Sequence, residues 1–170
     1  MQMKIFGRVF ALFLILTTVG CDRVTKHIAA TKLAGLPGQS YLGGIFRLEY
    51  VENPGAFLGL GAGLPDWARI GLLTFGAAAG VVAVAVAAFK FHWVGLPFAG
   101  AMLFIAGGAS NLIDRILHGS VIDFMNVGVG SLRTGIFNVA DIALMMGVVL
   151  MLFGSRVIRG PDQAMDVPKA

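Results

Sequence analysis

Two aspartates lie where a strongly apolar chain would least favour them. Asp123 lies in the sequence Val-Ile-Asp-Phe, just ahead of a long apolar segment, and Asp141 lies in the first turns of that segment. An ionisable side chain near lipid is costly, so it indicates a functional site by default. If the chain brings them together, two carboxylates can share one proton, and such a pair can activate a water molecule for hydrolysis.

The composition indicates that most of the chain is surrounded by lipid. Of its 170 residues, 57% are hydrophobic and only 13% are charged, and the mean hydropathy is +0.84. Soluble domains carry about 25% charged residues. We therefore expect an integral membrane protein, mainly α-helical. Residues 1–159 should form a single membrane-embedded domain, and residues 160–170 a disordered cytoplasmic tail.

Long apolar stretches predict the helices that must position the two aspartates. Residues 70–89 and 91–113 are each long enough to cross the hydrocarbon core. Residues 142–155 reach that length only if the span begins near Gly135, which places Asp141 inside it. Small residues in these stretches, including Gly76-x-x-x-Gly80, are typical of closely packed membrane helices.

The N-terminal region allows two interpretations. Residues 9–21 form a short apolar run that spans a membrane only if Arg8 and Asp22 reach the two interfaces. The same region is similar to a lipoprotein signal peptide, in which Cys21 would be acylated after cleavage. The part after such a cysteine should be a soluble domain, whereas this chain continues with three further spans. We expect an uncleaved first span and therefore four transmembrane helices.

The basic residues favour one orientation. Four spans place both termini on the same side of the membrane, and the basic residues on that side lie in short tails and one tight turn, where the positive-inside bias is most informative. We therefore expect both termini in the cytoplasm and the active site toward the outer face of a bacterial cytoplasmic membrane.

Two segments between the spans are expected outside the membrane. Residues 41–52 alternate between apolar and polar side chains, which is the period of a strand, and a turn at Asn53-Pro54-Gly55 follows. We predict a small extracytoplasmic β element there. Residues 114–134, which carry Asp123, are expected to be a loop that moves to admit a large substrate.

Five short motifs along the chain resemble those of lipoprotein signal peptidase, also called signal peptidase II. They run from the first span to the fourth in the order and approximate spacing of that family. The motifs are Asp22-Arg23-Val24-Thr25-Lys26, Glu52-Asn53-Pro54-Gly55-Ala56-Phe57, Ser110-Asn111-Leu112-Ile113-Asp114-Arg115, Val121-Ile122-Asp123-Phe124 and Phe137-Asn138-Val139-Ala140-Asp141. The chain departs from the usual pattern at Thr25, Pro54 and Ser110, where the family more often has Ser, Thr and Gly.

The resemblance implies an aspartyl endopeptidase. It would remove the signal peptide from a prolipoprotein that carries diacylglyceryl-cysteine, cutting just before that cysteine. Its partners would be this substrate and membrane lipid, with no nucleic acid, no metal and no organic cofactor, and we expect a monomer. A different class stays open: a non-catalytic paralogue, or a membrane scaffold that binds lipoproteins or lipid.

The resemblance and the residue types together assign roles in the site. Asp123 and Asp141 are the expected catalytic pair, although each aspartate alone is also explained by helix capping or by pairing with Arg115. The residues expected to bind substrate or orient the pair are Asn53, Gly55, Ala56, Asn111, Arg115, Asn138 and Ala140. Arg115 is also explained by snorkelling to the lipid headgroups. Asp22, Lys26 and Asp114 are expected to be structural, with Asp22 and Lys26 paired on a helix surface at spacing i, i+4.

Other chemistries fit the sequence less well. The histidines, His27, His92 and His118, are too far apart for a zinc-ligand motif, and no Gly-x-Ser-x-Gly motif is present. The net charge is +4, but the basic residues are dispersed over loops and tails. Contact with anionic lipid is sufficient to explain them, so we expect no nucleic acid partner.

Overall fold

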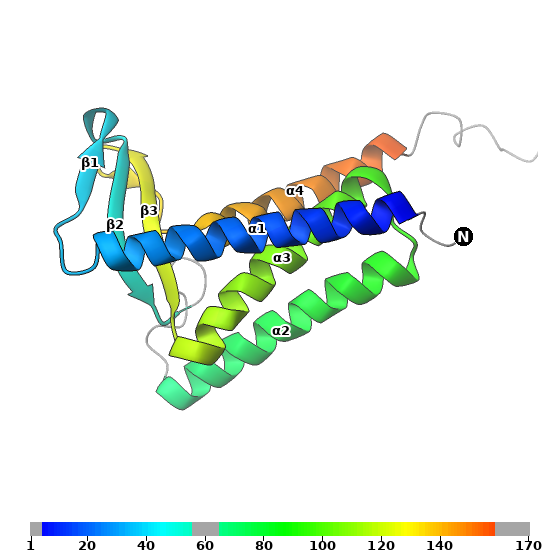
Figure 1. Ribbon diagram of the computed structural model, residues 1–170, viewed down its shortest axis with the longest axis horizontal. Helices are drawn as coiled ribbons and strands as arrows, with labels where there is room; N and C mark the ends of the chain where they lie inside the picture. Colours follow the sequence, from blue (N-terminus) through cyan, green and yellow to red (C-terminus); the bar gives the residue numbers. More distant parts are fainter. Residues whose placement is uncertain (1–4, 56–64, 159–170) are drawn as a thin grey trace, which may run out of the picture.

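The computed structural model describes residues 5–55 and 65–158, which form a helical bundle with a small antiparallel sheet at one end (Figure 1). The helices are α1 (Ile5–Lys32), α2 (Asp66–Lys90), α3 (Gly95–His118) and α4 (Val139–Ile158). The strands are β1 (Gln39–Tyr41), β2 (Phe46–Asn53), β3 (Val121–Val129) and β4 (Leu132–Arg133), with a short 3-10 helix, η1 (Leu42–Gly44), between the first two.

The helices account for the membrane character of the chain. Within the described residues, α1, α2 and α3 are each long and apolar enough to cross a membrane, and α4 contains the shorter apolar stretch Val139–Gly154. The first residues of α1 and the last described residues of α4 lie at one end of the bundle, and the sheet lies at the other (Figure 1). The described residues thus have the character of a mainly helical membrane protein with a small sheet at one end.

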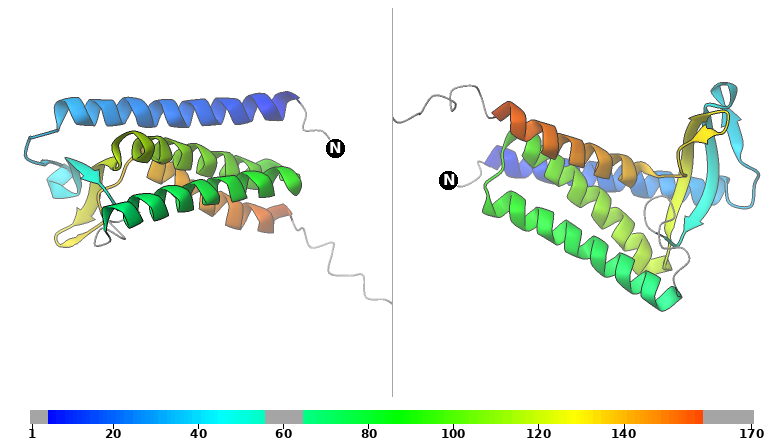
Figure 2. Two further views of the ribbon diagram at one scale, coloured as in Figure 1. Left: turned by 90° about the horizontal axis from the view of Figure 1, so that it is seen from below. Right: turned by 180° about the vertical axis from the view of Figure 1, so that it is seen from behind.

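α3 is the central helix. In its most apolar stretch 56% of residues are buried, against 11% for α1 and 6% for α2. Helices α1, α2 and α4 surround it in the two further views (Figure 2). Its C-terminal end is fixed by Gly119, whose left-handed backbone (φ 72°) lets its N–H bond to the carbonyl of Arg115. The chain then turns directly into β3.

Glycines set the close approach of α3 and α4. A Cβ atom at Gly107 would lie 2.4 Å from the carbonyl oxygen of Ala140, and one at Gly100 would lie 2.7 Å from that of Gly147. By contrast, a Cβ atom at Gly76 or Gly80 would meet nothing within 4 Å. The prediction that these two glycines pack against another helix is therefore wrong, because the described neighbours leave that face of α2 open.

The sheet has the order β1-β2-β3-β4 with antiparallel pairing throughout. The predicted β element is confirmed for β2, which covers most of the alternating segment. The expectation that Asp123 lies on a mobile loop is wrong. Asp123 lies within β3 and pairs with Val51 of β2. The hydrogen-bonded ladder between these two strands holds the backbone of Asp123 in place.

The α3–α4 contact yields a direct stability prediction. Gly107→Ala should lower the free energy of unfolding by about 1–3 kcal/mol, since the added methyl group must displace the backbone of α4. Gly76→Ala is the matched control and should be neutral or slightly stabilising, because a methyl group there meets nothing. Thermal unfolding in detergent measures both. Equal effects of the two substitutions would contradict the close approach of the helices.

Candidate active site

The N-terminal end of α4 is held by a reciprocal pair of bonds between Asn138 and Asp141. The side-chain oxygen of Asn138 accepts a bond from the backbone N–H of Asp141 (2.9 Å), and Asp141 Oδ2 accepts one from the backbone N–H of Asn138 (3.2 Å). This is the geometry of a capping box, which satisfies two N–H groups that a helix start leaves unpaired. Asp141 is therefore fixed in place by the same bonds that begin the helix.

Asp123 reaches the same asparagine from β3. Its carboxylate accepts a bond from Asn138 Nδ2 (2.6 Å) at one oxygen and one from Asn53 Nδ2 (2.9 Å) at the other. The two carboxylates therefore lie in one site, joined through Asn138. Asp123 is only 2% exposed. Burial raises the pKa of Asp123 to about 6, with Asn53 opposing the rise and the nearby Asp141 carboxylate adding to it.

Asn111 connects the pair to the rest of the bundle. Its Nδ2 donates to Asp141 Oδ1 (2.9 Å), while its Oδ1 accepts bonds from Lys26 Nζ (2.7 Å) and Asn138 Nδ2 (3.2 Å). The amide of Asn111 is thereby held in one orientation. Among the described residues, all the donors that contact the two carboxylates are amide groups, so neither Asp123 nor Asp141 has a direct cationic partner.

The charged side chains are paired a short distance away, in a buried ion cluster of Asp22, Arg23, Lys26 and Asp114. Lys26 Nζ lies 2.8 Å from Asp22 and 2.7 Å from Asp114, and Arg23 bonds to Asp114. Asp22, Lys26 and Asp114 are at most 2% exposed. The predicted i, i+4 contact is confirmed, but its location on a helix surface is wrong, because α3 and α4 cover it. Equal numbers of acids and bases reduce the cost of burying these charges.

Asp22 also reaches the start of α4. One of its oxygens accepts the backbone N–H of Ala140 (2.9 Å), and the other accepts the hydroxyl of Ser110 (2.7 Å). Asp22 thus caps a helix that begins more than a hundred residues further along the chain. Sequence reasoning noted Ser110 only as a departure from the family pattern and gave Arg23 no role. Their places inside the same motifs as Asn111 and Asp22 were the signal that pointed to both.

An apolar groove of about 370 Å³ runs from Asp141 between α2, α3 and α4. Asn111, Arg115 and Asp141 line it together with apolar side chains, and Gly76 and Gly80 line it on α2. The guanidinium of Arg115 donates to the carbonyl oxygen of Gly55 (3.2 Å). This bond ties the turn after β2 to α3.

The structure therefore brings most of the expected site residues together. The two aspartates and the three asparagines, with Ala140, Arg115 and Gly55, lie within one network of hydrogen bonds. Ala56 lies outside the described residues. In the part of the chain that the structure describes, no group of three or more His, Cys, Asp or Glu side chains could hold a metal ion.

The chain is similar to known proteins in sequence and in fold. Residues 14–157 match the family described as signal peptidase (SPase) II. A lipoprotein signal peptidase of Bifidobacterium adolescentis is 39% identical over 154 residues, covering 85% of this chain and 76% of the relative. The protein of the same name from Sphingopyxis alaskensis is 37% identical over 150 residues, covering 86% and 83%. A solved structure described as a bacterial membrane enzyme has a TM-score of 0.76 at 24% identity, over 95% of this chain and 93% of that one, which shows the fold alone.

Apolar helices, a sheet at one end and a carboxylate pair between them define a polytopic membrane protein with a buried polar site. The length of the match and the identity to the two relatives make the assignment specific. The chain belongs to the signal peptidase II family and is a bacterial membrane protein.

The raised pKa of Asp123 predicts a pH-dependent stability. Between about pH 4, the ordinary pKa of aspartate, and pH 6 the folded protein binds more protons than the unfolded chain, so its stability falls as the pH rises through that window. A shift of about two pKa units corresponds to about 3 kcal/mol. The Asp123→Asn variant lacks this pH-dependent contribution to stability. The difference in the free energy of unfolding between the variant and the unsubstituted protein should therefore shift in favour of the variant by up to about 3 kcal/mol between pH 4 and pH 7.

Unfolding midpoints in detergent across this pH range measure the effect. Glu49→Gln is a suitable control, because Glu49 is exposed on β2 and should show no such dependence. Parallel stability curves for Asp123→Asn and the unsubstituted protein would contradict the raised pKa.

Proposed function

We propose that the protein removes signal peptides from bacterial prolipoproteins as an aspartic-type endopeptidase, cutting before a diacylglyceryl-modified cysteine. Family membership and the relatives named lipoprotein signal peptidase support the substrate class. The observation that carries the mechanism is the joining of Asp123 and Asp141 through Asn138 at the end of an apolar groove. The apolar groove suits an apolar signal helix, and the carboxylate pair at its end suits hydrolysis of the peptide bond.

We further propose that all four helices cross the membrane, with both termini in the cytoplasm and the site toward the outer face. α4 has 20 residues and is therefore about 30 Å long, which matches the hydrocarbon thickness. The end of the bundle that holds the sheet and the carboxylate pair is then outside the membrane core, where water and the modified cysteine of the substrate meet. The signal helix would enter the groove laterally from lipid, between α2 and α4.

The two carboxylates divide the chemistry between them. One carboxylate takes a proton from a water molecule, whose oxygen attacks the carbonyl carbon before the modified cysteine. The other, in its protonated form, gives its proton to the carbonyl oxygen, and the tetrahedral intermediate collapses with proton transfer to the leaving amine. Burial raises the pKa of Asp123 to about 6, so a much larger fraction of it is protonated than of an ordinary aspartate at the same pH, and this supports its role as the proton donor. Asn53, Asn111 and Asn138 hold the two groups in their relative orientation.

Cleavage of a modified substrate tests the proposal. Purified protein incubated with a diacylglyceryl-modified prolipoprotein should release the signal peptide, detected as a mass shift. Asp123→Asn and Asp141→Asn should each reduce the rate by more than about a thousandfold, because an amide keeps the shape but cannot exchange a proton. Glu49→Gln, on the exposed side of β2, is the control and should cleave normally.

The outcomes separate the alternatives. Full turnover by either aspartate variant would require a different catalyst. Binding of prolipoprotein without cleavage by the unsubstituted protein would instead favour a scaffold. Circular dichroism and unfolding midpoints of each variant exclude loss of fold as the cause.

The turn after β2 gives a further prediction about substrate entry. Gly55 is buried, its N–H bonds to Asn53 Oδ1 (2.9 Å), and its carbonyl contacts Arg115. Gly55→Val adds a branched side chain beside these contacts, so KM should rise about tenfold or more while the helices stay folded. Gly38→Val, in the exposed segment before β1, is the control. Normal KM and kcat in Gly55→Val would show that this turn takes no part in recognition.

A further inference from the structure

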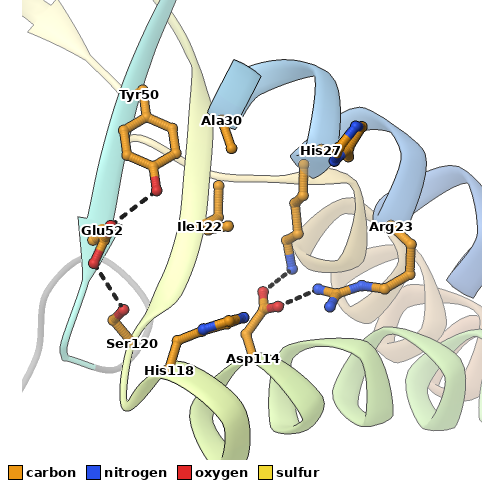
Figure 3. A pocket seen from close by; sticks show the side chains of 10 residues that line it. Arg23, His27, Ala30, Tyr50, Glu52, Asp114, His118, Ser120 and Ile122 are labelled. Carbon is orange, nitrogen blue, oxygen red and sulfur yellow. Dashed lines mark hydrogen bonds and ion pairs between the residues drawn. The ribbon is translucent and has the colours of Figure 1, made fainter. Parts of the chain in front are cut away.

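A second pocket, separate from the apolar groove, lies where α1 and α3 meet the sheet (Figure 3). Its volume is about 520 Å³. Tyr50 and Glu52 of β2 lie on one side of it, and Arg23 and His27 of α1 lie on the other, with His118 and Asp114 of α3 between them. Unlike the groove, it therefore presents charged and polar groups on two opposite walls.

The sheet separates this pocket from the carboxylate pair. Side chains along a strand alternate between its two faces. Glu52 and its cross-strand partner Ile122 line the pocket, whereas the adjacent Asn53 and Asp123 contact each other in the candidate active site. The pocket is thus a distinct site on the opposite face of β2 and β3, and the mechanism proposed above does not use it.

On the sheet side, Glu52 is held as a hydrogen-bond acceptor. It accepts bonds from the hydroxyls of Tyr50 (2.9 Å) and Ser120 (3.4 Å), and it is exposed. Burial and the bond to Glu52 raise the pKa of Tyr50, so its hydroxyl stays protonated and continues to donate. The carboxylate has no cationic partner among the described residues, which suits the binding of an ammonium group.

On the helix side, the free donors suit an anion. Arg23 uses one of its terminal nitrogens to bond Asp114, while its Nε has no hydrogen-bond partner in the described part of the chain. That N–H is buried, but the Arg23 side chain as a whole is 32% exposed, and its positive charge can attract an anion in the pocket. The imidazoles of His27 and His118 are exposed on the same pocket and add further donors.

Exposed apolar side chains are sequence neighbours of the histidines that line the pocket. Val24 and Ile28 flank His27 on α1, and Ile116 and Leu117 precede His118 on α3, all of them more than half exposed. The apolar stretches of α1 and α3 end here, so the pocket lies where a membrane-spanning helix passes from hydrocarbon to headgroups. A lipid whose headgroup occupied the pocket could lay its acyl chains on these residues.

We propose that this pocket binds the headgroup of a phospholipid with a primary ammonium, such as phosphatidylethanolamine. The ammonium contacts Glu52, and the phosphate lies near Arg23, His27 and His118. A glycerol headgroup lacks the cation that Glu52 would pair with, and a choline headgroup lacks the N–H donors. The site is therefore selective among the common phospholipids, and this selectivity does not depend on the proposed peptidase activity.

Lipid titrations with the full chain test the proposal. The delipidated protein in detergent is titrated with phosphatidylethanolamine, phosphatidylglycerol or phosphatidylcholine, and bound lipid is counted by native mass spectrometry. We expect one phosphatidylethanolamine to bind about tenfold more tightly than either other lipid, since a charged hydrogen-bonded contact distinguishes them. Glu52→Gln should abolish this preference, and Glu49→Gln, the same change at an exposed residue of β2 that does not line the pocket, should retain it.

A second variant keeps the test independent of Glu52. His118→Gln should weaken the binding of all three lipids by a similar factor, because each of them carries the phosphate. Equal binding of the three lipids, or loss of the preference in Glu49→Gln as well, would overturn the proposal. So would displacement of the bound phosphatidylethanolamine by an unlipidated peptide of mature lipoprotein sequence, which would make the pocket a peptide site.

Discussion

The side chain of Lys26 is 2% exposed, and its ammonium group meets Asp22, Asp114 and Asn111 at 2.7–2.8 Å. Burying a cation is tolerable only where opposite charge and full hydrogen bonding surround it. These three acceptors fix the position of α1 against α3. Through Asp22, which caps Ala140, the same contacts fix α4. The helices that carry the candidate active site are thus oriented by one ion cluster that itself takes no part in the proposed proton transfers.

Cations bond to Asp22 and Asp114, whereas neutral amide groups bond to Asp123 and Asp141, and this difference has a chemical consequence. Cations directly bonded to Asp123 and Asp141 would favour the ionised form of both carboxylates and leave no proton to donate. In the described structure the cations bond instead to Asp22 and Asp114, and the pair receives only amide donors. Asn111 links the two sets through its side chain, because its oxygen faces Lys26 and its nitrogen faces Asp141. The arrangement keeps a shared proton available while the surrounding charges are balanced.

The sequence predicted the helices and the aspartate pair better than it predicted the environment of either. Hydropathy located the apolar helices, and the i, i+4 spacing predicted the Asp22–Lys26 contact. The burial of that contact was missed because its cover, Asp114 and Ser110, lies about ninety residues away. Asp123 was assigned to a loop because residues 121–129 show no clean alternation, and they become a strand only by pairing with β2. Local patterns cannot reveal such long-range partners.

The place of Asp123 in β3 changes how a substrate can reach the pair. A strand paired with β2 and bonded to α4 through Asn138 cannot swing aside as a loop can. Under the proposed function, a substrate would reach the pair through the groove beside α2, past Gly76 and Gly80, where no side chain narrows it. The glycines that sequence reasoning assigned to helix packing would then serve entry, whereas those on α3 and α4 hold these two helices together. Rigid carboxylates beside an open lateral groove suit a substrate that arrives already embedded in the membrane.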